Sequence, residues 1–203
     1  AFEIIREFGS PVYVYSEDIL RQRCRELIDA FDGRLSPSFS IKANSNISLL
    51  NIIREEGIGA DAMSHGEIFV HEHAGFSSDE IFYIGNNVSA DELRYCIDRG
   101  ILVSADSLSQ LESLGRINRG GRVALRFNPG IGAGHCEKVV TAGHKTKFGI
   151  DPRFCAQAKE LLSKYDMKLV GINQHIGSLF LEPAPYVEAA ENLLEMALDN
   201  FPG

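Results

Sequence analysis

The sequence predicts an α/β fold of the (β/α)8 TIM-barrel type, incomplete here, with about six strand–helix units. Short runs rich in β-forming residues alternate with segments of helical period. The first five runs begin at residues 37, 58, 81, 101 and 122, so successive starts lie 20 to 23 residues apart. This even spacing, without a long crossover midway, favours a barrel over a doubly wound sheet.

Six runs are predicted as barrel strands because each is short and rich in the residues that strands prefer. They are Pro37–Lys42, Ile58–Met63, Ile81–Ile84, Ile101–Ala105, Arg122–Phe127 and Leu169–His175. A seventh run, Val12–Tyr15, precedes the first helix and lies outside the rhythm. We therefore expect residues 1–16 to carry a strand of a separate β-domain, and residues 17–203 to form a partial barrel that stops before strands seven and eight.

The helices between the strands are marked by periodicity and by capping residues. Residues 22–31 place Cys24, Leu27, Ile28 and Phe31 on one face, and Leu20 extends that face by a turn. Capping boxes, in which a Ser and a Glu or Gln three residues later satisfy free backbone N–H groups, are predicted at Ser64/Glu67, Ser89/Glu92 and Ser107/Gln110. Asp151 followed by Pro152 predicts one more helix start.

Composition excludes several classes of protein. Apolar residues make up 44% of the chain and charged residues 24%, which is typical of a globular protein and not of a disordered one. The formal net charge of −8, without a block of like charges, argues against nucleic acid and anionic membrane surfaces as partners. The four cysteines lie far apart, which predicts neither a disulfide framework nor a zinc site and fits a reduced, cytoplasmic protein.

Four ionisable residues of mixed type end four of the predicted strands. Alternation along each strand turns Lys42, Asp61, Arg126 and His175 to the barrel interior, close to its C-terminal mouth. Such a group has the charges to hold an anionic, reactive ligand. Structural alternatives remain open: a solvated lysine, an ion pair between Asp61 and Arg126, and a hydrogen-bonded structural histidine.

Two other features are weaker signals. His65, His71 and His73 fall on one predicted helix, but residues two apart point in different directions there, so we expect no metal site. A Gly-rich insertion at residues 128–135 lacks the fingerprints of phosphate-binding loops. It is either a long surface loop or, as its length favours, a functional or interface segment.

Five ordered motifs make the chain resemble the barrel-type (fold type III) pyridoxal-phosphate decarboxylases. The resemblance runs from about residue 2 to residue 203 and includes the N-terminal stretch at residues 8–15. The motifs are Ser40-Ile-Lys-Ala-Asn44, Gly59-Ala-Asp-Ala-Met-Ser-His-Gly-Glu67, Arg126-Phe-Asn-Pro-Gly130, Lys145-Thr-Lys-Phe-Gly-Ile150 and Gly171-Ile-Asn-Gln-His-Ile-Gly-Ser178.

The resemblance implies pyridoxal 5′-phosphate as cofactor and assigns roles to individual residues. Lys42 matches the lysine that bonds covalently to the cofactor, and His175 the histidine that stacks on its ring, so both are expected to be catalytic. Ser178 matches a phosphate contact. Asp61 matches an acidic cofactor-binding residue near the lysine, and Arg126 an arginine that supports the cofactor site.

The resemblance also implies a reaction and an assembly. The expected reaction is decarboxylation of meso-2,6-diaminopimelate to L-lysine in lysine biosynthesis, because residues 128–135 and 174–178 look most like that branch of the family. Carboxynorspermidine, ornithine or arginine decarboxylation, and a relative that binds without turnover, stay as alternatives. Lys147 matches a lysine at the interface of the family's homodimer.

Family members continue beyond the matched part. Their last two barrel strands and β-domain carry a phosphate loop, an acidic partner of the cofactor's pyridine nitrogen and a catalytic Cys that none of the four cysteines here matches. The 203-residue chain alone is therefore expected to be inactive.

Overall fold

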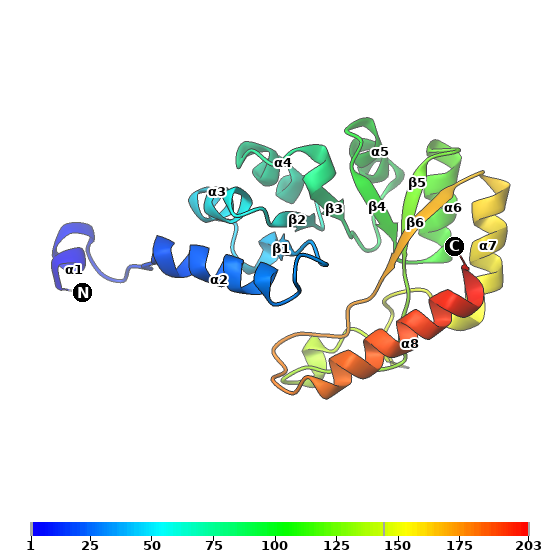
Figure 1. Ribbon diagram of the computed structural model, residues 1–203. Helices are drawn as coiled ribbons and strands as arrows, with labels where there is room; N and C mark the ends of the chain where they lie inside the picture. Colours follow the sequence, from blue (N-terminus) through cyan, green and yellow to red (C-terminus); the bar gives the residue numbers. More distant parts are fainter. Residues whose placement is uncertain (1, 144, 203) are drawn as a thin grey trace.

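The computed structural model describes residues 2–143 and 145–202 and contains one sheet of six parallel strands in the order β1-β2-β3-β4-β5-β6 (Figure 1). Each strand therefore pairs with the next one along the chain. A doubly wound sheet reverses its strand order partway, whereas a barrel keeps the chain order. The prediction of a partial TIM-type barrel is confirmed.

All six predicted barrel strands form, and each is shorter than predicted. Their bounds are β1 (Ser38–Ser40), β2 (Gly59–Ala62), β3 (Ile81–Tyr83), β4 (Leu102–Ala105), β5 (Arg122–Arg126) and β6 (Lys168–Asn173). The run predicted over residues 37–42 turns into a short 3-10 helix, Ile41–Ala43, directly after β1. Lys42 thus lies in the turn above the strand and not in the strand.

The helices that connect the strands cover the outside of the curved sheet (Figure 1). They are α3 (Ile47–Glu55), α4 (His65–His73), α5 (Ala90–Asp98), α6 (Leu108–Ile117) and α7 (Cys155–Lys164). Two helices, α1 (Phe2–Phe8) and α2 (Glu17–Asp29), precede β1, and α8 (Ala184–Asn200) follows β6. Short 3-10 helices occupy Ser78–Glu80, Glu137–Val139 and, as the Asp151–Pro152 start predicts, Pro152–Phe154 before α7. Across the described residues, every helix is too short or too polar to span a lipid bilayer.

The main core lies between the sheet and its helices. Its largest fully buried side chains include Tyr83, Phe127, Leu93 and Leu111. A smaller cluster joins α2 to the barrel through Cys24, Ile53 and Ile58, with Leu20, Ile28 and Phe39 packed against it. Leu27 and Phe31, which we predicted on the same buried face, are 46% and 42% exposed. The apolar face of α2 is thus narrower than its sequence predicts.

The N-terminal segment packs on the barrel only loosely. Val12–Tyr15 form no strand, and a helix, α1, precedes them. A strand requires a hydrogen-bonded neighbour, and no strand pairs with this segment in the described part of the chain. Tyr13 is 90% exposed, and the Tyr15 hydroxyl accepts a hydrogen bond from Asn44 Nδ2 at 3.0 Å. Assignment of this segment to a β-domain stays a prediction.

Two of the three predicted capping boxes have a different geometry. Ser89 and Glu92 form the expected reciprocal pair at the start of α5. Ser64 and Ser107 cap α4 and α6, but the side chains of Glu67 and Gln110 do not bond to the backbone of these serines. Each accepts instead from the N–H group of the residue before the serine. Glu67 accepts from the Met63 N–H at 2.6 Å, and Gln110 accepts from the Asp106 N–H at 3.0 Å. These bonds fix the chain where β2 and β4 end.

Candidate active site

A pocket of about 200 Å³ lies at the carboxyl ends of the strands. It brings together all four ionisable residues that strand alternation placed at one mouth. Its lining consists of Lys42, Asp61, Met63, Ile84, Asn86, Arg126, Thr141, Phe148, Asn173, Gln174 and His175. Active sites of parallel barrels form at this end of the strands, because loops from several strands converge there.

Lys42 and Asp61 stand on neighbouring strands. Ser40, two residues before Lys42, is in register with Asp61 on β2. Among the described residues, no carboxylate forms an ion pair with Lys42, which leaves the amine available to a ligand. Burial raises the pKa of Asp61, and the nearby Ser40 hydroxyl and Lys42 ammonium oppose that shift.

Arg126 ends β5 and is 4% exposed. Its Nη1 lies 3.1 Å from Asp106 Oδ1, so Asp106 is its ion-pair partner. The alternative of a structural ion pair between Asp61 and Arg126 is therefore wrong. Burial raises the pKa of Asp106, and the Arg126 guanidinium opposes that rise. Asp106 was not among the residues predicted from the sequence. It directly follows β4 and faces the same side of the sheet as Ser104. The Ser104 hydroxyl donates a hydrogen bond of 2.6 Å to Asn173 Oδ1 on β6.

His175 lies two residues beyond the end of β6. Thr141 Oγ1 donates a hydrogen bond of 2.9 Å to the His175 carbonyl, which joins the strand end to the loop after β5. Burial lowers the pKa of His175 to about 4, and the positive charges of Lys42 and Arg126 contribute to the shift. At neutral pH the imidazole is therefore uncharged.

This lowered pKa makes the stability of the fold depend on pH. Between pH 6.5, the ordinary value for histidine, and about pH 4, the unfolded chain binds a proton at residue 175 before the folded chain does. Wild type is therefore expected to lose stability more steeply across this window than His175→Gln. Urea unfolding at half-unit pH steps measures the difference, and an NMR titration of the ring should show no midpoint above pH 5. Parallel stability curves for the two proteins would contradict the shift.

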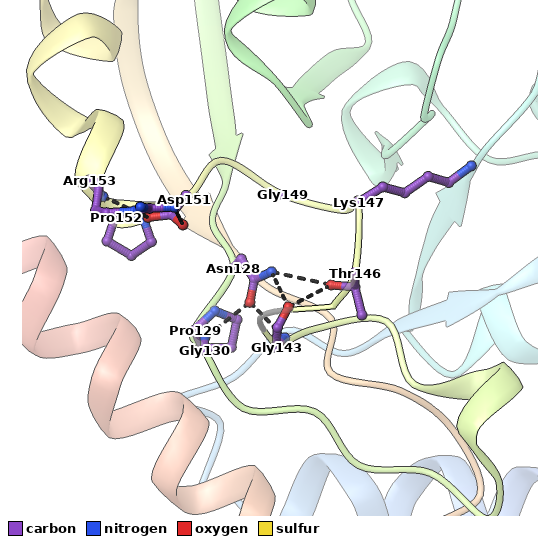
Figure 2. Close-up of a pocket in the computed structure, with 10 residues that line it drawn as sticks. All are labelled: Asn128, Pro129, Gly130, Gly143, Thr146, Lys147, Gly149, Asp151, Pro152 and Arg153. Atoms are coloured by element: carbon purple, nitrogen blue, oxygen red, sulfur yellow. Dashed lines mark hydrogen bonds and ion pairs between the residues drawn. The ribbon is translucent and has the colours of Figure 1, made fainter.

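Ser178 and Lys147 lie outside this pocket. The Ser178 carbonyl accepts from the His135 N–H at 3.3 Å, so the residue packs against the Gly-rich insertion. Lys147 is exposed and lines a second cavity of about 500 Å³, where its side chain points away from Asn128 and Asp151 (Figure 2). Its Nζ lies 5.4 Å from the centre of the Phe148 ring. Ser178 and Lys147 are thus separate from Lys42, Asp61, Arg126 and His175, which line the first pocket.

The Gly-rich insertion is organised by one side chain, Asn128 (Figure 2). Its Oδ1 accepts from the N–H groups of Gly130 at 3.0 Å and Gly143 at 2.8 Å. Its Nδ2 donates to the Gly143 carbonyl and to Thr146 Oγ1. The start of the insertion is thereby joined to Gly143 and Thr146, later in the same loop, which explains how the long segment between β5 and α7 holds a defined shape.

The three helical histidines have separate environments. His71 is fully buried with Nε2 3.2 Å from the Asp61 carbonyl, and burial lowers its pKa. His65 stacks on Tyr95, and His73 packs against Phe69. The described residues contain no group of three potential metal ligands.

One buried polar atom in the pocket wall lacks a partner. Gln174 Oε1, an acceptor, forms no hydrogen bond with any described residue, whereas the Asn86 side-chain amide faces the Asp106 carboxylate and helps to lower its pKa. A buried polar group without a partner costs free energy unless a ligand or water satisfies it. The position of Gln174 in the pocket wall therefore indicates a polar ligand.

The chain resembles known proteins over nearly its whole length. Residues 17–199 match the family model described as "Pyridoxal-dependent decarboxylase, pyridoxal binding domain". The diaminopimelate decarboxylase of Methanothermobacter thermautotrophicus is 41% identical over 201 residues, which are 97% of this chain and 47% of that protein. The Escherichia coli K12 diaminopimelate decarboxylase is 37% identical over 176 residues, 85% of this chain and 41% of that protein.

Solved structures agree with these relatives. The diaminopimelate decarboxylase of Helicobacter pylori complexed with L-lysine superposes with a TM-score of 0.91 at 28% identity, over 98% of this chain and 52% of that one. The chain spans about half the length of the curated relatives it matches. The match of the family model over residues 17–199 shows that the chain belongs to the pyridoxal-dependent decarboxylases and carries their pyridoxal-binding domain.

Proposed function

We propose that the protein containing this chain decarboxylates meso-2,6-diaminopimelate to L-lysine and CO2 in lysine biosynthesis. The observation that carries this proposal is the convergence of Lys42, Asp61, Arg126 and His175 in one pocket. It is supported by relatives named diaminopimelate decarboxylase at 31–41% identity. A related structure that holds L-lysine, the product of this reaction, adds further support.

The residues of the pocket fit pyridoxal phosphate, the cofactor of the family. Lys42 offers a primary amine, the group that reacts with an aldehyde. Arg126 and Lys42 provide positive charge for an anionic ligand. Gln174 Oε1 offers an unused acceptor, and the uncharged His175 ring can stack on a heteroaromatic ring. The aldehyde, the negative charge and the ring of the cofactor thus each have a candidate partner among these residues.

The proposed mechanism divides the work between cofactor and protein. Once bound, pyridoxal phosphate supplies the electron sink for the electron pair released when CO2 leaves. Lys42 would hold the cofactor through Nζ and would carry protons at that atom. Asp61 and Arg126 fix the charge around Lys42, and the His175 ring orients the cofactor. Walls formed by Met63, Ile84 and Phe148 limit the access of water.

The remaining assignments belong to the same proposal. Ser178 contacts the cofactor phosphate, and Lys147 lies at the interface of a homodimer, roles that rest on the family motifs around them. The protein is cytoplasmic, in keeping with four free cysteines among the described residues, three of them buried. Its partner is a small amino-acid substrate, and its negative charge disfavours binding to nucleic acid or anionic membranes.

The test is CO2 release by the native gene product with pyridoxal phosphate. The substrates are meso-diaminopimelate, carboxynorspermidine, ornithine and arginine. We expect release from diaminopimelate alone, with L-lysine as the other product. Release from another amino acid would retain the chemistry and refute the substrate. Cofactor binding without release from any of the four would refute decarboxylation and favour a binding protein.

A further inference from the structure

Asp106 connects two parts of the pocket that come from different segments. It directly follows β4 and is 7% exposed. Its Oδ1 lies 3.1 Å from Arg126 Nη1 and also accepts a hydrogen bond of 3.1 Å from the Gly149 N–H. One carboxylate oxygen therefore contacts both the buried guanidinium at the end of β5 and the backbone of the loop that leads to α7.

The backbone around Asp106 is itself held in place. Gln110 is buried in the first turn of α6, and its Oε1 accepts from the Asp106 N–H at 3.0 Å. The Gln110 Nε2 donates to the Gly85 carbonyl at 3.1 Å, next to the pocket residue Asn86. The ends of β3 and β4 are thus joined, which gives the carboxylate a fixed point from which to orient its partners.

The loop contact determines where an aromatic wall of the pocket stands. Phe148, directly before Gly149, lines the pocket, and the Arg126 guanidinium lies 5.2 Å from the centre of its ring. Gly149 has a φ of +80°, and a Cβ there would come 2.9 Å from the backbone of Phe127 and Asn128. The loop therefore passes close to β5 at the position where Asp106 binds it.

We propose that Asp106 is a positioning residue that sets Arg126 and the Phe148 wall as one unit for cofactor binding. Arg126 carries a charge that a buried site tolerates only with a partner. Asp106 supplies that partner, and the same carboxylate oxygen accepts a hydrogen bond from the Gly149 N–H. The Arg126 guanidinium and the Phe148 ring are thereby held at a constant separation. The inference rests on the proposed use of this pocket by pyridoxal phosphate.

The test compares Asp106→Asn and Asp106→Ala with Glu56→Gln in the full native gene product, without substrate. Glu56 is a matched control: its side chain is 8% exposed and pairs with Arg21 and Arg25, but between α2 and α3. We expect both Asp106 variants to bind pyridoxal phosphate at least tenfold more weakly in an absorbance titration. Hydrogen exchange of peptides covering residues 145–149, without cofactor, should also quicken, whereas Glu56→Gln should stay within twofold of wild type in both.

Exchange and affinity equal to those of Glu56→Gln would overturn the inference. If the Asp106 variants do not fold, Asp106→Ala is made in an Arg126→Gln background, where no buried charge is left alone. Exchange at residues 145–149 must then exceed that of Arg126→Gln itself, and equal exchange refutes the role. Absence of cofactor binding by wild type would refute the proposed function instead, and the exchange comparison would still decide the role of Asp106 in the loop.

Discussion

Replacing Lys42 by alanine is expected to abolish decarboxylation by the native gene product, with a loss of at least about a thousandfold. Lys42 is the one lysine in the lining of the pocket that the described residues form. Its removal deletes both the amine that holds the cofactor and the group that carries protons. The measurement is the rate of CO2 release at saturating cofactor and diaminopimelate.

A second readout separates covalent binding from turnover. Borohydride reduction fixes an amine-bound aldehyde to the chain, so the mass of the peptide containing Lys42 should rise in wild type and no labelled peptide should appear in Lys42→Ala. Lys145→Ala is the matched control, because Lys145 is an exposed lysine of the neighbouring loop that does not line this pocket. Label on another lysine of the wild-type protein would show that the cofactor amine has been assigned to the wrong residue.

The architecture could be predicted because it depends on local patterns. The even spacing of strand starts and the alternation within each strand both follow from the backbone geometry of a βα unit. The segment Val12–Tyr15, which forms no strand here, shows what such patterns do not determine. A β-rich composition indicates that a segment can pair, but pairing depends on a neighbour that a sequence pattern does not reveal.

The same difference separates the site residues that alternation found from those it missed. Lys42, Asp61, Arg126 and His175 follow from one rule, that residues at the ends of parallel strands, or just beyond them, gather at one mouth. The partner of Arg126 does not follow from that rule, because Asp61 and Asp106 both end strands that flank the pocket. Their distances to Arg126 depend on the curvature of the sheet, and the structure alone selects Asp106.

Bonds made by side chains of the first helical turn were only half predictable. The Ser-x-x-Glu and Ser-x-x-Gln spacings identify the helix starts at Ser64 and Ser107. They do not determine whether the second side chain bonds to the capping residue or to the residue before it. At α6 this choice matters, because the bond from Gln110 fixes the backbone of Asp106.

Gly177→Ala is expected to destabilise the folded chain by on the order of 3 kcal/mol. Gly177 has a φ of +145°, and a Cβ built there would overlap the Ala133 carbonyl oxygen and come 2.9 Å from that of Val139. Both atoms belong to backbone, which cannot rotate away as a flexible side chain would. The segment also bonds to the insertion through the Ile176 carbonyl, which accepts from the N–H groups of Ala133 and Thr141.

The matched control for this prediction is Gly171→Ala. Gly171 lies in β6, six residues earlier, and a Cβ there would meet no atom within 4 Å. Urea unfolding of both variants measures the difference in the free energy of unfolding. Equal midpoints would show that the backbone at Ala133 and Val139 shifts without loss of stability, and would contradict the prediction. Because His175 precedes Gly177 by two residues and its carbonyl is bonded to Thr141, the strain should reach the pocket. Gly177→Ala is therefore expected to bind pyridoxal phosphate more weakly than Gly171→Ala even where both are fully folded.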